Sequence, residues 1–393
     1  MLSYSHHNHH IQQSEFQQQT AADPPYLSQT KMSPPPFKAL YLTPSATFVT
    51  REIAAPYTPT TPAQSLIAVH YSGINPGDLR HFHMGLHSFV AGYDFTGTVL
   101  SGPAAFPPGT PVLGMTWPAH ARPLHAGAHQ AYLLADPYLL WRRPDDLAPL
   151  SAVGIPVAAQ TAADGLFNCL GFGLPAAGVE GKDAGRERVL IWGGGGAVGW
   201  AAVQLAKAAG FREVLVAARE GNHEVLMRGG ATRCFDYTRP GVVEEIRGHV
   251  REAGGELGNV FDAVGVGLGI FEPVGAEKGR YEDSTPALAK RCLSDGVVER
   301  KEAGLCCVLP VLQDPDWGFA LFSRKGEQQE ADHPGWWQRQ EKVVSWLIEN
   351  HATAWRPLKT RVVREAGEAA TAIRDVYEGK LSMEKVAIEH PML

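Results

Sequence analysis

The feature that most constrains the fold of this chain is a glycine-rich turn. It lies between an apolar run typical of a strand and a run whose apolar residues have helical spacing. Residues 189–210 read VLIWGGGGAVGWAAVQLAKAAG, so we expect a strand at 189–192 that turns directly into a helix. The spacing Gly-x-Gly-x-x-Gly permits a tight turn, close approach of the backbone to a pyrophosphate and close helix packing. The helix N-terminus can then bind an anion without a cationic side chain. The predicted phosphate-binding residues are Gly194, Gly195, Gly196, Ala197, Val198 and Gly199.

The loop lacks the Gly-Lys-Ser/Thr ending of a nucleoside triphosphate loop, which favours NAD(P) or FAD over ATP. A second strand at 213–218 would complete the βαβ unit that this fingerprint requires. A Gly-rich turn with a purely structural role is the alternative. Strands and helices continue to alternate, which predicts an α/β domain with a doubly wound parallel sheet. The further expected strands lie at 231–237, 259–265, 304–312 and 316–323.

The residue after the second strand indicates which dinucleotide binds. An acidic residue there would hydrogen-bond the ribose 2′-hydroxyl of NAD, but this chain has Arg219. A guanidinium suits a 2′-phosphate in charge and in donor geometry, so NADPH is favoured over NADH. Glu220 beside it weakens the argument, and a solvated loop arginine is the alternative.

Composition changes along the chain indicate the domain boundaries. Residues 1–36 are rich in Gln, His and Pro, which predicts a disordered tail, and its histidines are more simply explained as incidental than as a metal site. Short β-like runs with Pro and Gly at 37–157 predict an irregular antiparallel barrel. The nucleotide-binding domain would occupy 158–324, and 325–393 would return to the first domain.

Charge and hydropathy exclude several classes of partner. A net charge of −6 does not predict a basic surface that would attract nucleic acid, and no apolar run approaches the length of a membrane span. We therefore expect small-molecule or protein partners and a cytoplasmic location. The 5 cysteines form no Cys-x-x-Cys pair, so neither a disulfide framework nor a zinc cluster is expected.

Several motifs in order resemble the medium-chain dehydrogenase/reductase superfamily. They are INPGDLRHF at 74–82, GYDFTGTV at 92–99, the glycine loop, GGATRCFDY at 229–237, NVFDAVG at 259–265 and EGKLSMEKVAI at 378–388. Within this superfamily the chain looks like the zinc-free quinone and enoyl reductases, and most like fungal trans-acting enoyl reductases that serve polyketide synthases. The resemblance implies a GroES-like barrel as the catalytic domain beside a Rossmann-type domain.

The residues at the zinc-ligand positions of the resembled alcohol dehydrogenases are not metal ligands. Asn75-Pro76-Gly77-Asp78 and Tyr93 stand where those enzymes place a cysteine and a histidine. We therefore predict no metal site. Without a Lewis acid, reduction of an activated C=C is more plausible than alcohol oxidation, because it needs only charge stabilisation at a distant carbonyl.

The resemblance also assigns roles to individual residues. It places Asn75, Pro76, Gly77 and Asp78 beside the nicotinamide, with Asp78 and Asp94 expected to bind backbone donors. Arg80 stands where relatives often have a lysine, and it is a poor proton donor but a fair electrostatic one. Thr161, expected at the start of a helix, could stabilise an enolate, or it could simply cap that helix. The remaining implied cofactor-binding residues are Asn222, Tyr237, Val264 and Gly265.

The resulting expectation is an NADPH-dependent, zinc-independent reductase. It would add hydride to the C=C of an α,β-unsaturated thioester carried by a polyketide synthase. A quinone oxidoreductase or general enone reductase is one alternative. A protein that binds NADPH without turnover is the other.

Overall fold

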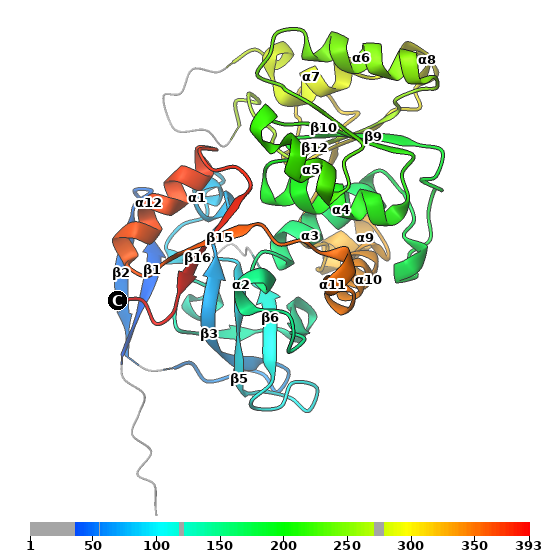
Figure 1. Ribbon diagram of the computed structural model, residues 1–393. Helices are drawn as coiled ribbons and strands as arrows, with labels where there is room; N and C mark the ends of the chain where they lie inside the picture. The colour runs from blue at the N-terminus through cyan, green and yellow to red at the C-terminus, as the bar shows by residue number, and fades with distance from the viewer. Residues whose placement is uncertain (1–35, 55, 118–121, 271–278) are drawn as a thin grey trace, which may run out of the picture. The chain divides into compact units, whose positions relative to one another are not determined.

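The computed structural model describes residues 36–54, 56–117, 122–270 and 279–393. The predicted disordered tail, residues 1–36, lies outside these ranges except for its last residue. Figure 1 shows the arrangement of the helices and strands.

A six-stranded parallel sheet forms the first of two main β structures. Its order is β11-β10-β9-β12-β13-β14, with every neighbouring pair parallel, which confirms the predicted doubly wound α/β sheet. Several strands are shorter than predicted, partly because Gly265 takes a left-handed φ of 68° and Pro310 lacks an N–H. The strands are β9 (Arg188–Trp192), β10 (Glu213–Ala217), β11 (Arg233–Phe235), β12 (Asn259–Asp262), β13 (Gly304–Cys307) and β14 (Gly318–Phe319).

Helices cover both faces of this sheet (Figure 1). Alternate side chains of β9 point to opposite faces, so Val189 and Ile191 enter one core and Leu190 the other. On the first face lie α4 (Ala197–Ala209) and α5 (His223–Gly229). On the second lie α6 (Val242–Ala253), α7 (Thr285–Arg291) and α8 (Asp295–Arg300).

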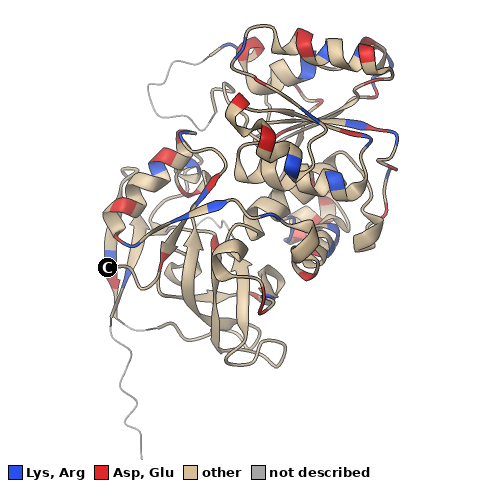
Figure 2. Ribbon diagram, viewed as in Figure 1, with Lys and Arg blue, Asp and Glu red and all other residues tan. Residues whose placement is uncertain are grey.

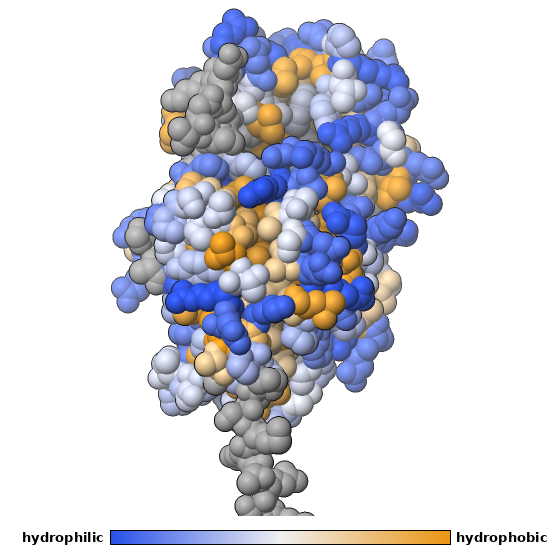
Figure 3. Space-filling model, turned by 90° about the vertical axis from the view of Figure 1, so that its left-hand side faces the viewer, coloured by the Kyte–Doolittle hydropathy of each residue, from blue (hydrophilic) through white to orange (hydrophobic). Residues whose placement is uncertain are grey.

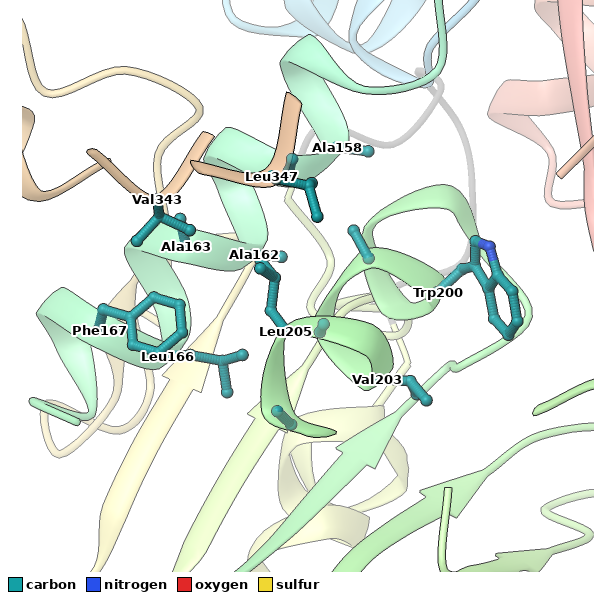
Figure 4. Close-up of a cluster of buried hydrophobic side chains, with 14 of the residues drawn as sticks. Ala158, Ala162, Ala163, Leu166, Phe167, Trp200, Val203, Leu205, Val343 and Leu347 are labelled. Atoms are coloured by element: carbon teal, nitrogen blue, oxygen red, sulfur yellow. The ribbon is translucent and has the colours of Figure 1, made fainter. Parts of the chain in front are cut away.

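The first core continues into α3 (Pro156–Ala163), which runs on as a π-helical turn over Asp164–Cys169. This helix packs between α4 and α10 (Trp336–Glu349). Figure 4 shows its side chains interleaved with those of both neighbours. The labelled members are Ala158, Ala162, Ala163, Leu166 and Phe167 of this helix, Trp200, Val203 and Leu205 of α4, and Val343 and Leu347 of α10.

The second main β structure is a seven-stranded sheet that joins distant parts of the chain. Its order is β15-β16-β3-β5-β6-β8, with β7 paired to β3, and all its pairs are antiparallel except β15 with β16. Its strands are β3 (Ser65–Gly73), β5 (Asp94–Ser101), β6 (Pro111–Met115), β7 (Tyr132–Ala135), β8 (Leu140–Arg142), β15 (Lys359–Val363) and β16 (Glu384–Glu389). A small antiparallel sheet contains β1 (Phe37–Leu42), β2 (Phe48–Ile53) and β4 (Phe89–Val90).

The remaining helices are short or lie against these sheets. Among them, α1 packs against α12. Their bounds are α1 (Gly77–His83), α2 (Pro149–Ala152), α9 (Glu327–Asp332), α11 (His351–Ala354) and α12 (Ala366–Tyr377). Short 3₁₀ turns occur at Leu124–Ala126, Pro137–Leu139, Pro175–Ala177, Glu220–Asn222 and Tyr281–Asp283.

Acidic and basic residues are both spread over the outer helices, including α6 and α12 (Figure 2). On the face drawn in Figure 3, the more hydrophobic areas lie near the middle and hydrophilic residues border them. Within the described ranges, no helix has both the length and the apolar character needed to cross a membrane.

A buried ion pair connects the closing strand to the rest of the chain. Lys385 Nζ in β16 donates to Asp94 Oδ2 in β5 at 2.8 Å, and the two side chains are 3% and 0% exposed. Asp94 Oδ1 accepts from Val157 N in the first turn of α3 at 2.8 Å. One carboxylate therefore ties together β5, β16 and the beginning of α3.

We expect Asp94→Asn to destabilise the fold strongly, because it leaves the Lys385 charge buried without a counter-ion. Breaking one side of a buried pair costs about 3–5 kcal/mol, measurable as a change in the free energy of urea unfolding. Adding Lys385→Met should recover part of this loss. Removing the partly exposed pair Arg361 and Glu384 nearby should cost less than about 1 kcal/mol. A loss of under about 1 kcal/mol in Asp94→Asn would contradict this account.

Candidate functional site

The glycine loop after β9 has the geometry of a phosphate cradle. Gly193 takes a left-handed φ of 87°, and a Cβ on Gly199 would lie 2.2 Å from Gly193 O. A Cβ on Gly194 would lie 2.3 Å from a methyl carbon of Val216, so neither position accepts a side chain without movement. Gly196 differs, because the nearest described atom to its ideal Cβ is 3.6 Å away. This open side of the loop lets a ligand approach the backbone.

The helix that follows the loop begins without a side-chain cap. Gly196 is the N-cap of α4, and the first helical residues are Ala197, Val198 and Gly199. The N–H groups of a first turn have no intrahelical acceptor, and the helix dipole is positive at this end. These residues therefore fit the pyrophosphate of a dinucleotide.

The closing segment of the chain lies directly on the glycine loop. Met383 N donates to Gly195 O at 2.8 Å, and Asn222 Nδ2 donates to Ser382 Oγ at 2.7 Å. A Cβ on Gly195 would lie 2.5 Å from Ser382 Oγ. Neither Ser382 nor Gly193 was among the site residues predicted from the sequence. The motif at 378–388 pointed to the segment containing Ser382, but nothing local indicated its partner.

Arg219 and Tyr237 come together at the end of β10. Arg219 Nε donates to Tyr237 Oη at 3.1 Å, and Tyr237 is 37% exposed. Glu220 pairs with Arg239 at 2.6 Å, so its carboxylate is engaged away from Arg219. Asn222 turns toward Ser382 instead. A guanidinium and a phenol that face solvent together can bind a phosphate.

We expect replacement of both Arg219 and Tyr237 with Ala to weaken NADPH binding much more than NADH binding. Lost hydrogen bonds to a charged group cost about 1.5–3 kcal/mol, which corresponds to about 10- to 100-fold in Kd. Titration calorimetry with both cofactors measures the difference. Arg228→Ala, an exposed arginine on α5 paired with Glu224, is the matched control. Equal weakening of both cofactors would contradict the 2′-phosphate assignment.

Asp262 ends β12 at the carboxyl edge of the parallel sheet, where doubly wound folds bind ligands. Its Oδ1 accepts from Val264 N at 2.8 Å and Gly265 N at 3.2 Å, and its Oδ2 accepts from Thr285 Oγ1 at 2.6 Å. Burial raises the pKa of this carboxyl from 3.8 to about 6. Asp262 therefore shapes the turn that contains Val264 and Gly265.

The raised pKa of Asp262 predicts a pH-dependent stability. The folded state holds this proton more tightly than the unfolded state, so the contribution to stability is present below pH 4 and is lost as the pH rises through about 6. A shift of about two units corresponds to about 3 kcal/mol. The measured quantity is the free energy of unfolding of the wild type minus that of Asp262→Asn. This difference should fall by up to that amount between about pH 4 and pH 7. Asp283→Asn, at a 64% exposed side chain, is the control. A constant difference across this range would contradict the assignment.

The turn before α1 is held by its own aspartate and by the buried ion pair. Asp78 accepts from Asn75 N at 2.7 Å and from Gly92 N at 3.1 Å. Asn75 Oδ1 accepts from Lys385 Nζ at 2.9 Å, and Asn75 Nδ2 donates to Asp94 Oδ2 at 2.8 Å. Pro76 is exposed and Gly77 is partly exposed. The two carboxylates are thus occupied with internal donors.

Lys385 also lies near the first turn of α4. Together with Ala197 at the start of α4 it lines a cavity of about 10 Å³. That is room for about one water molecule. The closing segment contacts both parts of the site, because Met383 N donates to Gly195 O and Lys385 Nζ donates to Asn75 Oδ1.

The two expected catalytic side chains differ in their surroundings. Arg80 lies near Cys307 and Tyr377, and burial lowers the pKa of its guanidinium. Among the described residues this guanidinium makes no hydrogen bond. Thr161 lies in the interior of α3, because α3 begins at Pro156, so both the expected start-of-helix position and the capping interpretation are wrong. Its hydroxyl donates to Val157 O at 2.7 Å, so it must rotate before it can donate to a substrate.

His81 and Tyr93, which were not among the predicted catalytic residues, lie beside Arg80. His81 Nδ1 and Tyr93 Oη are joined by a short hydrogen bond. The Arg122 guanidinium carbon lies 4.4 Å from the centre of the Tyr93 ring, and Phe322 packs against both aromatic rings. Burial lowers the pKa of His81 to about 4 and raises the pKa of Tyr93.

The described part of the chain has no group of three or more His, Cys, Asp or Glu residues arranged to hold a metal. Cys306 and Cys307 in β13 are buried, and burial raises the pKa of both thiols. This environment favours packing over nucleophilic chemistry.

No protein-family model matches the sequence. Trans-enoyl reductase himH of Aspergillus japonicus is 31% identical over 189 residues, covering 46% of this chain and 54% of that protein. Trans-enoyl reductase traG of Penicillium crustosum is 28% identical over 276 residues, covering 67% of this chain and 71% of that protein. The match to himH thus spans about half of that relative's length.

Solved structures share the fold. The CurK enoyl reductase has a TM-score of 0.60 at 18% identity, covering 90% of this chain and 99% of that chain. The quinone oxidoreductase of Coxiella burnetii has a TM-score of 0.58 at 21% identity, with 90% and 99% coverage. The chain therefore has the fold of the medium-chain dehydrogenase/reductase superfamily and is similar in sequence to fungal trans-enoyl reductases, which confirms the predicted resemblance.

Proposed function

We propose that this protein is an NADPH-dependent, zinc-independent enoyl reductase. It reduces the C=C bond of an α,β-unsaturated thioester, and a polyketide synthase carrier domain presents the substrate. The observation that carries this proposal is the similarity to fungal proteins named trans-enoyl reductases. The geometry supports it, because the closing segment contacts both the phosphate cradle and the Asn75 turn, and a basic side chain follows that turn.

The proposed cofactor site uses residues from three parts of the chain. The cradle would bind the pyrophosphate through Gly194–Gly199, and Arg219 and Tyr237 would bind the 2′-phosphate. The Asn75–Asp78 turn and the Val264–Gly265 turn would border the nicotinamide. The bound cofactor supplies the hydride.

The protein's own contribution is positioning and charge stabilisation. When hydride adds to the β-carbon, negative charge develops on the thioester oxygen. Arg80 is a fixed positive charge with no bonded acceptor among the described residues, so it is available to stabilise that charge. Thr161 would add a hydrogen bond after rotating away from Val157 O.

Purified protein with NADPH should reduce an enoyl thioester, presented either as an N-acetylcysteamine ester or on a carrier domain. NADPH oxidation at 340 nm and mass detection of the saturated product measure the reaction. Free quinones and simple enones, assayed at matched concentration, should react more slowly. Rapid quinone reduction without any thioester reduction would instead identify a quinone oxidoreductase. Tight NADPH binding without oxidation by any acceptor would indicate a non-catalytic binding protein.

A further inference from the structure

The proposed reduction ends with a proton on the α-carbon of the substrate, and Arg80 is a poor source of it. A guanidinium stays protonated at any pH where the protein is folded. The carboxyls of Asp78 and Asp94 are occupied by internal donors. A different proton source is therefore needed on this side of the site.

The His81–Tyr93 pair lies where such a source is required. His81 follows Arg80 on α1, and its ring packs against Gly77 of the turn, since a Cβ on Gly77 would lie 3.3 Å from His81 Cε1. Its ring centre is 6.3 Å from that of Phe322, which follows β14 at the carboxyl edge of the parallel sheet. His81 thus lies between the Asn75 turn and the edge where a dinucleotide binds.

The hydrogen-bond inventory fixes the direction of the bond between the two side chains. Burial lowers the pKa of His81 to about 4, so the imidazole is neutral and carries one proton at pH 7. Tyr93 is 2% exposed, and within the described part of the chain its hydroxyl has no acceptor other than His81 Nδ1. A buried hydroxyl without an acceptor is costly, so Tyr93 donates to Nδ1 and the remaining imidazole proton is on Nε2. Among the described residues Nε2 makes no hydrogen bond, so it can donate to a substrate.

Arg122 favours the tyrosinate form of Tyr93 and so opposes the effect of burial, which raises the pKa of that phenol. Its side chain is 4% exposed and donates to neutral acceptors, namely Gly92 O and Ala126 O at 2.7 Å and Thr116 Oγ1. No described carboxylate lies within ion-pair distance of it, although Asp78 contributes at longer range. A buried cation without a bonded anion is unfavourable, and a tyrosinate 4.4 Å below it would compensate that charge.

We propose that His81 is the catalytic acid of the reduction and that Tyr93 is the positioning residue that resupplies its proton. This inference rests on the proposed reductase function. When negative charge has developed on the substrate, the His81 Nε2–H bond breaks and a C–H bond forms at the α-carbon. In the same step the Tyr93 O–H bond breaks and an N–H bond forms at Nδ1. Tyr93 becomes a tyrosinate beside Arg122. After the product leaves, water protonates His81 Nε2 and the Nδ1 proton returns to Tyr93, which restores both side chains.

The test follows the α-carbon in D₂O with wild type, Tyr93→Phe and His81→Gln. The wild type should place deuterium on one face of the α-carbon. Both variants should lower kcat by about 100-fold, as expected for loss of a general acid, and should place deuterium on both faces. NADPH affinity should change less than twofold, because neither side chain is assigned to the cofactor. His87→Gln, at an exposed histidine just beyond α1, should match the wild type.

A second readout does not depend on turnover. In ¹⁵N-histidine spectra, His81 should be protonated at Nε2, and Tyr93→Phe should shift its Nδ1 resonance. A proton on Nδ1 in the wild type would overturn the relay. So would single-faced deuteration at a normal rate in both variants, with the proposed reductase function left standing. If the wild type reduces no enoyl thioester, the proposed function fails and the relay fails with it.

Discussion

The contact on which the site depends most is the buried charge pair between Lys385 and Asp94. Two ionic groups with almost no solvent exposure are unfavourable unless their hydrogen bonds are satisfied, and here they are. Asp94 binds Lys385, Asn75 and the first turn of α3, while Lys385 also binds Asn75. The closing strand, the turn before α1 and the helix that contains Thr161 are therefore positioned by one network. The same strand brings Ser382 and Met383 onto the glycine loop.

The phosphate cradle is therefore formed by two segments that are far apart in the sequence, the glycine loop and the closing segment. The loop glycines exclude side chains on two sides, toward Val216 and toward Gly193, and stay open at Gly196. Their conformation is held by Met383 N, more than 180 residues later in the chain. The loop therefore already has this conformation without a ligand, and a preformed site loses less entropy on binding. A preformed cradle suits a cofactor that must present its reactive ring in one orientation.

The sequence was sufficient for features that depend on local pattern. The parallel sheet followed from alternating apolar runs, and the cradle followed from glycine spacing, because short-range sterics determine both. The contacts of Lys385, Ser382 and Tyr93 could not be predicted, since their partners lie 12 to 310 residues away in the sequence. The resemblance implied that Thr161 stands at the start of a helix, but α3 begins five residues earlier at Pro156 and continues as a π-helical turn. The strands β12 and β13 end at Asp262 and Cys307, earlier than predicted, and are followed by Gly265, whose φ is 68°, and by Pro310, which has no N–H.

The charges around the Asn75 turn favour a reaction that creates an anion. Arg80 and Arg122 have no bonded carboxylate among the described residues, whereas Asp78 and Asp94 are both satisfied by N–H donors. The fixed field at this position is therefore positive, and it stabilises negative charge that develops on a substrate oxygen. Hydride addition to a conjugated thioester produces such a charge, and so does the deprotonation of Tyr93 that would follow. The substrate anion and the tyrosinate form one after the other, so the same pair of arginines can stabilise both. The positive charge that favours a conjugated thioester as hydride acceptor thus also favours proton release from Tyr93.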